Sequence, residues 1–164
     1  MRAAYDYGAD AVYAGSPRYS LRARNNEFAK LDVLEQGIKE AHERNKKFFL
    51  TVNTLPHNSK LKTFVADMEP LIAMKPDALI MADPGLIMTV REKWPEMPIH
   101  LSVQANTTNY WGVKFWQNIG VERIILSREL SMEEIAEIRQ ECPDIELEVF
   151  IHGALCIAYS GRCL

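Results

Sequence analysis

Short apolar, β-rich runs alternate with segments of helical periodicity along the 164-residue chain. This alternation constrains the fold more than any other feature of the sequence, because each run except the last is followed by a helical segment. The runs that predict strands are 10–15, 47–53, 77–83, 99–106, 123–127 and 146–153, and the segments that predict helices are 31–45, 60–74, 84–93, 110–119 and 132–140.

Repeated βα units require parallel strands joined by right-handed crossovers. Units of similar spacing favour a barrel over a doubly wound sheet, and the first run is not followed by the G-x-G-x-x-G motif of dinucleotide-binding sheets. The predicted fold class is α/β: an incomplete TIM-like (β/α) barrel of about six parallel strands with alternating helices.

Six such units do not close the eight-stranded barrel that this pattern builds. We therefore expect residues 1–164 to form a single (β/α)-barrel domain fragment. The expected fragment lacks a strand before residue 1, and it lacks the rest of the barrel after residue 164.

Local signals predict where several helices begin. Ser131 followed by Glu134 predicts a capping box, because the hydroxyl can accept a backbone amide while the Glu side chain reaches back. Pro84 is expected in the first turn of its helix, where a missing N–H costs nothing. Asn58 or Ser59 is expected to cap the helix that follows.

The composition supports a globular domain, with 48% hydrophobic and 25% charged residues. A net charge of −3 gives no general electrostatic attraction for nucleic acid, although it does not exclude a local basic patch. No apolar run is long enough to span a membrane, and the first residues do not have the pattern of a signal peptide. The expected location is cytoplasmic, and three cysteines fit a reducing compartment.

Polar residues follow the predicted strands, at the edge where βα barrels place their chemistry. Each could be a loop cap, but together they predict a mouth that holds a polar small molecule, with Arg128 as the partner for a carboxylate. The candidate substrate-binding residues are Arg22, Asn53, Gln104, Asn106, Arg128 and His152.

A basic, aromatic-containing segment follows the first strand. Arg18, Arg22 and Arg24, with Tyr19 among them, could contact an anionic ligand or RNA phosphates. The alternative is a solvated loop whose arginines pair with nearby acids.

Two of the three cysteines, Cys156 and Cys163, lie at the end of the sequence among small residues. Thiolates are soft anionic ligands for iron and zinc, and small residues between them allow the backbone to curl around an inorganic centre. The spacing matches neither C-x-x-C nor a ferredoxin run. From the pattern alone, the pair could be metal ligands or small buried apolar residues.

The same stretch resembles the signature of the collagenase-like peptidases, peptidase family U32. The matching positions are Glu148, Phe150, Gly153, Ala154, Leu155, Cys156, Gly161 and Cys163. Upstream text such as YGADAVYAG, VNTLPHNSKLKTF and ILSRELS also resembles this family, and the resemblance is strongest to its tRNA-hydroxylating branch.

The resemblance implies a tRNA-modifying enzyme that forms 5-hydroxyuridine at the wobble position, with prephenate as co-substrate and a 4Fe–4S iron-sulfur cluster on four cysteines. Cys156 and Cys163 match the first two ligands, the other two lie beyond Leu164, and Cys142 matches none. The implied partners are tRNA and a small-molecule carboxylate. Catalytic residues are not assigned, and the oligomeric state stays open.

Two other functions are alternatives to tRNA hydroxylation. The family name suggests a peptidase, which would need Cys156 or Cys163 as nucleophile and a histidine such as His152 as base. A non-catalytic tRNA-binding component is the third possibility, because no residue pattern here by itself requires catalysis.

Overall fold

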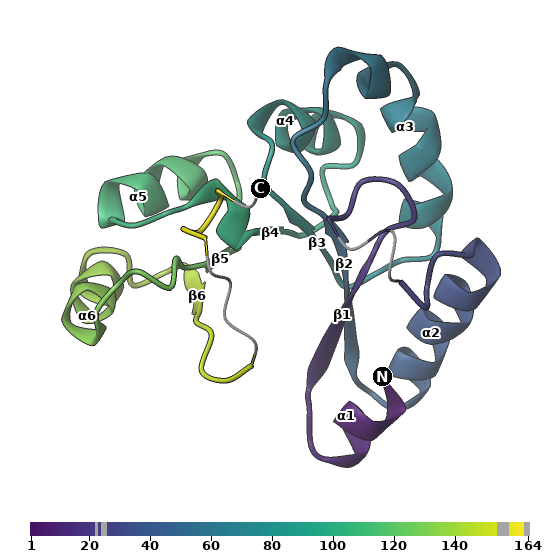
Figure 1. Cartoon of the computed structure of the whole chain (residues 1–164), viewed down its shortest axis with the longest axis horizontal. Coiled ribbons are helices and arrows are strands. Elements are labelled where there is room, and N and C mark those ends of the chain that lie inside the picture. The colour runs from purple at the N-terminus through teal and green to yellow at the C-terminus, as the bar shows by residue number, and fades with distance from the viewer. Residues whose placement is uncertain (22, 24–25, 154–157, 163–164) are drawn as a thin grey trace. The chain divides into compact units, whose positions relative to one another are not determined.

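The computed structural model describes residues 1–164 except 22, 24–25, 154–157 and 163–164 (Figure 1). Arg22, Cys156 and Cys163 therefore lie outside the described residues. The chain divides into two compact units, Met1–Asp83 and Pro84–Leu164, and each is described by itself.

The first unit is built around three parallel strands in chain order. β2 pairs with β1 on one side and with β3 on the other, in a register that sets Tyr13 opposite Phe49 and Thr51 opposite Ile80. The elements are α1 (Arg2–Asp6), β1 (Ala11–Gly15), α2 (Leu31–Glu43), β2 (Lys47–Val52), α3 (Asn58–Ala73) and β3 (Ala78–Met81).

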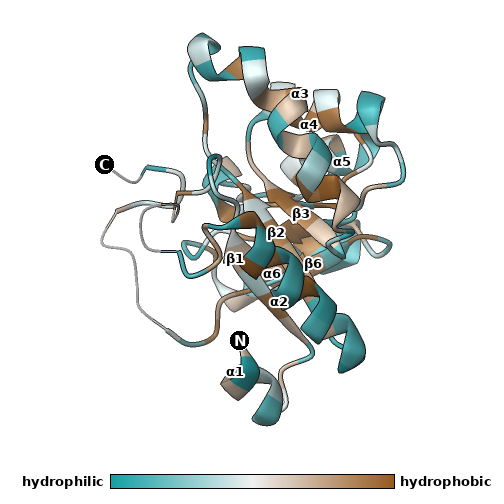
Figure 2. Ribbon diagram, turned by 90° about the vertical axis from the view of Figure 1, so that its right-hand side faces the viewer, coloured by the Kyte–Doolittle hydropathy of each residue, from teal (hydrophilic) through white to brown (hydrophobic). Residues whose placement is uncertain are grey.

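Burial explains this arrangement. All four residues of β3 are buried, as is β2 after Lys47, which is the pattern of a parallel sheet covered on both faces. The helices bury residues at helical spacing, Leu34, Ile38 and Ala41 on α2 and Phe64, Met68 and Leu71 on α3. Figure 2 shows β2 and β3 in the brown of hydrophobic residues and much of α2 in the teal of hydrophilic ones.

The second unit repeats the pattern with shorter strands. β5 lies between β4 and β6, parallel to both, with His100 opposite Arg123 and Ile125 opposite Glu148. The elements are α4 (Pro84–Lys93), β4 (Ile99–Leu101), the 3₁₀ helix η2 (Val103–Ala105), α5 (Tyr110–Asn118), β5 (Arg123–Ile125), α6 (Met132–Glu141) and β6 (Glu146–Glu148).

The α/β fold class is confirmed, with six parallel strands and helices between them. Within each unit the strands neighbour one another in chain order, as in a (β/α) barrel, and the order does not reverse as it does in a doubly wound sheet. The expected single domain, with its missing strand and missing remainder, stays a prediction. No helix of the described residues is both long enough and apolar enough to cross a membrane.

Three local expectations need correction, and two hold. The strand expected at 99–106 ends at Leu101, because the Ser102 hydroxyl accepts the Gln104 amide and the chain turns into η2. The run 146–153 is a strand only to Glu148. α3 begins at Asn58 after His57, so neither Asn58 nor Ser59 is its cap. The capping box of Ser131 and Glu134 and the start of α4 at Pro84 are confirmed.

Candidate functional site

The carboxyl ends of β4 and β5 are joined by side-chain hydrogen bonds. The Ser127 hydroxyl donates to Oδ1 of Asn106 over 2.7 Å, and the Ser127 amide donates to the Thr107 carbonyl over 3.4 Å. Asn106 adopts a left-handed conformation, with φ of 49°, which asparagine tolerates better than most residues. Two of the predicted strand ends are thus brought together.

A short turn lies against these strand ends. We call residues 158–162, the described stretch between Cys156 and Cys163, the inter-cysteine turn; the Arg162 amide closes it by donating to the Tyr159 carbonyl over 2.9 Å. The Ser160 amide donates to Oε1 of Glu129 over 2.8 Å. Gly161 has φ of +74°, and a Cβ there would lie 2.6 Å from the Gln104 carbonyl oxygen.

The side-chain carboxylate of Glu129 accepts the hydrogen bond from this turn. Burial is the largest single effect and acts to raise the pKa of Glu129, but hydrogen bonds from Ser160 and from its own amide, with the charge of Arg128, together outweigh it, and the pKa lies below its usual value. A charged acceptor strengthens the hydrogen bond from the Ser160 amide.

The Ser160 side chain has an unusual environment. The residue is only 3% exposed; its hydroxyl makes no hydrogen bond of normal geometry in the described part of the chain, although it lies near enough to the Glu129 carboxylate to help lower the pKa of that group. A buried hydroxyl without a partner is uncommon and costs free energy.

A cavity of about 430 Å³ opens beside the ends of β5 and β6. The guanidinium of Arg128 lies over the ring of Phe150 at 4.6 Å from its centroid. Among the described residues no carboxylate lies within ion-pair distance of Arg128, so its donors can serve a ligand. The lining residues are Leu126, Ser127, Arg128, Leu130, Met132, Ile135, Val149, Phe150, Ile151, His152 and Gly153.

Two positions of the signature have structural partners that the sequence pattern did not reveal. Glu148 accepts a hydrogen bond from Arg123 over 3.2 Å, and Glu146 accepts another over 2.8 Å. Phe150 stacks under Arg128. The strand register, which sets Arg123 opposite Glu146, could have indicated the Arg123–Glu146 contact, but Phe150 and Arg128 lie beyond the paired strands.

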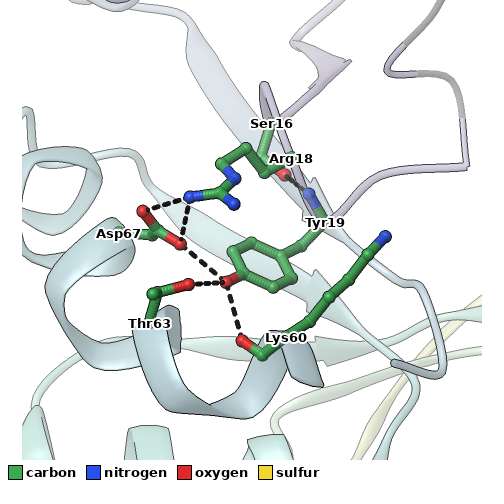
Figure 3. Close-up of polar contacts among 6 residues, drawn as sticks. All are labelled: Ser16, Arg18, Tyr19, Lys60, Thr63 and Asp67. Carbon is green, nitrogen blue, oxygen red and sulfur yellow. Dashed lines mark hydrogen bonds and ion pairs between the residues drawn. The ribbon is translucent and has the colours of Figure 1, made fainter. Parts of the chain in front are cut away.

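In the first unit, the segment after β1 is held by a buried tyrosine (Figure 3). Tyr19 is 1% exposed, and its hydroxyl donates to Asp67 on α3 over 2.7 Å. Arg18 donates to both oxygens of Asp67, each over 2.8 Å. For Arg18, the structure therefore favours pairing with an acid over contact with a free anion.

Tyr19 and Asp67 also affect each other's titration. Burial, reinforced by the Asp67 carboxylate, raises the pKa of Tyr19. Burial acts to raise the pKa of Asp67, but hydrogen bonds from Tyr19, Thr63 and Arg18 outweigh it, and the pKa lies below its usual value. Asp67 on α3 is therefore held as an anion, and it links α3 to the segment after β1 through Arg18 and Tyr19.

The predicted site residues fall into three groups. Gln104, Asn106, Arg128 and His152 belong to the second unit, where His152 is exposed and lines the Arg128 cavity. Asn53 belongs to the first unit, where its Oδ1 accepts the Leu21 amide over 3.3 Å. Arg22, Cys156 and Cys163 lie outside the described residues.

The described residues contain no group of three or more His, Cys, Asp or Glu side chains that could hold a metal ion. Cys142 is 2% exposed at the end of α6, and burial raises the pKa of its thiol. This environment agrees with the interpretation that Cys142 is not a metal ligand.

The chain is closely similar to two bacterial proteins. It is 67% identical over 164 residues to the tRNA hydroxylation protein P of Escherichia coli and 68% identical over 164 residues to that of Haemophilus influenzae. Each match covers 100% of this chain but only 36% and 35% of the two relatives. The chain thus spans about a third of their length.

The fold is that of a solved structure, a U32 peptidase, with a TM-score of 0.67 and 16% sequence identity; the match covers 87% of this chain and 60% of the other. A sequence model described as peptidase family U32 matches residues 1–164. Because that match covers the whole sequence, and the parallel β/α framework agrees with it, the chain belongs to peptidase family U32.

Proposed function

We propose that this chain is the barrel portion of an enzyme that hydroxylates tRNA, forming 5-hydroxyuridine at the wobble position in a prephenate-dependent reaction. The observation that carries the proposal is the 67% identity, over every residue of the chain, to a protein named for tRNA hydroxylation. Such a role would place the protein in the cytoplasm, with tRNA as its partner.

The Arg128 cavity supports a carboxylate co-substrate. A guanidinium forms two parallel hydrogen bonds with a carboxylate, and Arg128 has no such partner among the described residues. The apolar wall formed by Leu126, Met132 and Ile135 suits the ring of a molecule such as prephenate. Pockets of this kind bind through apolar contact and use a few polar groups to fix orientation.

Cys156 and Cys163 would supply two of the four thiolates of a 4Fe–4S cluster. The left-handed Gly161 between them allows a tight turn in the short segment that separates the two cysteines. When bound, such a cluster transfers electrons or offers an iron to a ligand.

The test is the nucleoside profile of tRNA from a strain that lacks the gene. We expect 5-hydroxyuridine to disappear and to return with the wild-type gene but not with a Cys156→Ser gene. Unchanged 5-hydroxyuridine in the deletion strain would reject the proposal, and it would leave a non-catalytic tRNA-binding component as the better account.

A peptidase is the second candidate because the matched family and the solved relative both carry that name. It predicts that the purified protein cleaves a gelatin-like substrate and that Cys156→Ala abolishes cleavage. Absence of cleavage by the wild-type protein removes this candidate without affecting the nucleoside test.

A further inference from the structure

Arg128 and Phe150 come together because β5 and β6 pair in register. Ile125 of β5 lies opposite Glu148 of β6, so the chain leaves the two strands at the same edge. Arg128 follows that pair by three residues and Phe150 by two, and the guanidinium carbon lies over the ring at 4.6 Å from its centroid. Both side chains line the cavity of about 430 Å³, Arg128 from the segment after β5 and Phe150 from the segment after β6.

The contact restrains the Arg128 side chain before any ligand arrives. An arginine side chain loses conformational freedom when it is held in one position, and a ligand that must impose this order binds more weakly. A ring against one face of the guanidinium restricts the side chain in advance. The N–H donors lie in the guanidinium plane, so they can still bind a carboxylate.

We propose that Phe150 is a positioning residue: its ring holds the Arg128 guanidinium in the orientation that binds a carboxylate in this cavity. The inference rests on the proposed function only in taking the ligand to be a carboxylate attached to an apolar ring. Phe150 acts through Arg128. In this it differs from Leu126 and Ile135, which line the apolar wall of the cavity and would contact the ring of the ligand.

The chain offers matched variants to test this role. Phe150→Leu removes the ring and keeps an apolar side chain, whereas Phe150→Tyr keeps the ring. Phe115→Leu is the control, because Phe115 is an exposed phenylalanine on α5 that does not line the cavity. Arg128→Ala provides a background in which Phe150 has no guanidinium to position.

Two probes separate positioning from apolar contact. Phenylpyruvate carries a carboxylate, and phenylacetone has the same ring and ketone without the carboxylate. Titrations of the isotope-labelled full chain, followed by NMR, measure the affinity for each probe. We expect Phe150→Leu to weaken phenylpyruvate binding by about three- to tenfold, which corresponds to the loss of one cation–π contact at a partly exposed site. Phenylacetone binding should be unchanged.

The pattern across variants decides the inference. It is supported if Phe150→Leu weakens binding of phenylpyruvate alone, if this loss disappears in the Arg128→Ala background, and if Phe150→Tyr and Phe115→Leu match the wild type. It is overturned if the wild type does not bind phenylpyruvate or if Phe150→Leu binds it as tightly as the wild type does. An equal loss for both probes also overturns it, because Phe150 then contacts the ligand itself or supports only the fold.

Failure of the proposed function would give a different result. If phenylpyruvate binding depends on Phe150 as described while tRNA from the deletion strain keeps its 5-hydroxyuridine, tRNA hydroxylation is rejected and the positioning role of Phe150 is supported.

Discussion

Arg128 lies over the ring of Phe150, with its guanidinium carbon 4.6 Å from the ring centroid, and this contact joins the end of β5 to the segment that follows β6. A guanidinium stacked on an aromatic face keeps its in-plane N–H donors free. The same contact therefore orients Arg128 and leaves it able to bind a carboxylate in the cavity.

Under the proposed function, replacement of Arg128 should weaken binding of a carboxylate co-substrate. We expect Arg128→Ala to raise the KM for prephenate by about tenfold or more, and Arg128→Lys to recover only part of the loss, because lysine lacks the planar pair of donors. Steady-state kinetics of tRNA hydroxylation measure both. Lys93→Ala, an exposed cation on α4, is the control. A KM unchanged in Arg128→Ala would place the carboxylate elsewhere.

Tyr19→Phe should destabilise the first unit. The substitution removes a hydroxyl that donates to Asp67 over 2.7 Å and leaves the ring in its buried position. We expect a loss of about 1–2 kcal/mol in the free energy of unfolding, measured by urea denaturation. Tyr7→Phe should have no effect, since Tyr7 is 93% exposed. Equal stability of the two variants would show that the Tyr19–Asp67 bond contributes nothing.

The lowered pKa of Asp67 predicts an acid-sensitive contribution to stability. A carboxyl whose pKa is lower in the folded than in the unfolded state stabilises the fold above the unfolded pKa, near 4. That stabilisation is lost as the pH falls through the folded pKa. We expect the urea concentration at the unfolding midpoint of the wild type to decrease as the pH drops below about 4. In Asp67→Asn this decrease should be less steep. Parallel pH profiles for the two proteins would contradict this.

Two buried serines should respond in opposite ways to removal of their hydroxyls. Ser160→Ala removes a hydroxyl with no partner among the described residues, so the free energy of unfolding of the metal-free chain should stay unchanged or rise slightly. Ser102→Ala removes the acceptor of the Gln104 amide and should cost about 1 kcal/mol. Urea denaturation compares them, and a loss in Ser160→Ala as large as in Ser102→Ala would show that Ser160 has a partner in the protein.

Gly37→Ala should destabilise α2 although alanine is the better helix former. A Cβ at Gly37 would lie 2.5 Å from the ring of Phe28, and that ring is already packed edge-on against Phe48 at 5.4 Å. We expect a loss of about 1–3 kcal/mol from overpacking, read from the thermal transition. In a Phe28→Ala background, Gly37→Ala should cost less free energy of unfolding than it does in the wild type.

The sequence was sufficient for the order of strands and helices, because buried parallel strands and amphipathic helices leave periodic patterns that neighbouring residues define. It was insufficient where the outcome depends on hydrogen bonds between competing local partners. Ser102 is an example: its hydroxyl ends β4 early by accepting the Gln104 amide, whereas the apolar pattern predicted a strand to residue 106.

In the candidate site, too, some features could be predicted from the sequence and others could not. Strand-end residues such as Asn106 and Arg128 can be identified from their place after a strand, because the fold brings those ends to one edge. The contacts of these residues cannot be identified in this way. The Asn106–Ser127 hydrogen bond spans 21 residues of sequence, and the Glu129–Ser160 hydrogen bond spans 31. Both depend on the register of β4, β5 and the chain after β6, which no local pattern specifies.

The buried Tyr19 ring and the Phe28 ring against Gly37 hold the chain at two points, with eight residues between them that include Arg22 and Arg24. Lengthening a tethered loop costs little closure entropy, about 0.6 kcal/mol for each doubling. Insertions between these two tethers should therefore be tolerated by the fold, and the segment can vary in length without loss of the contacts at either end.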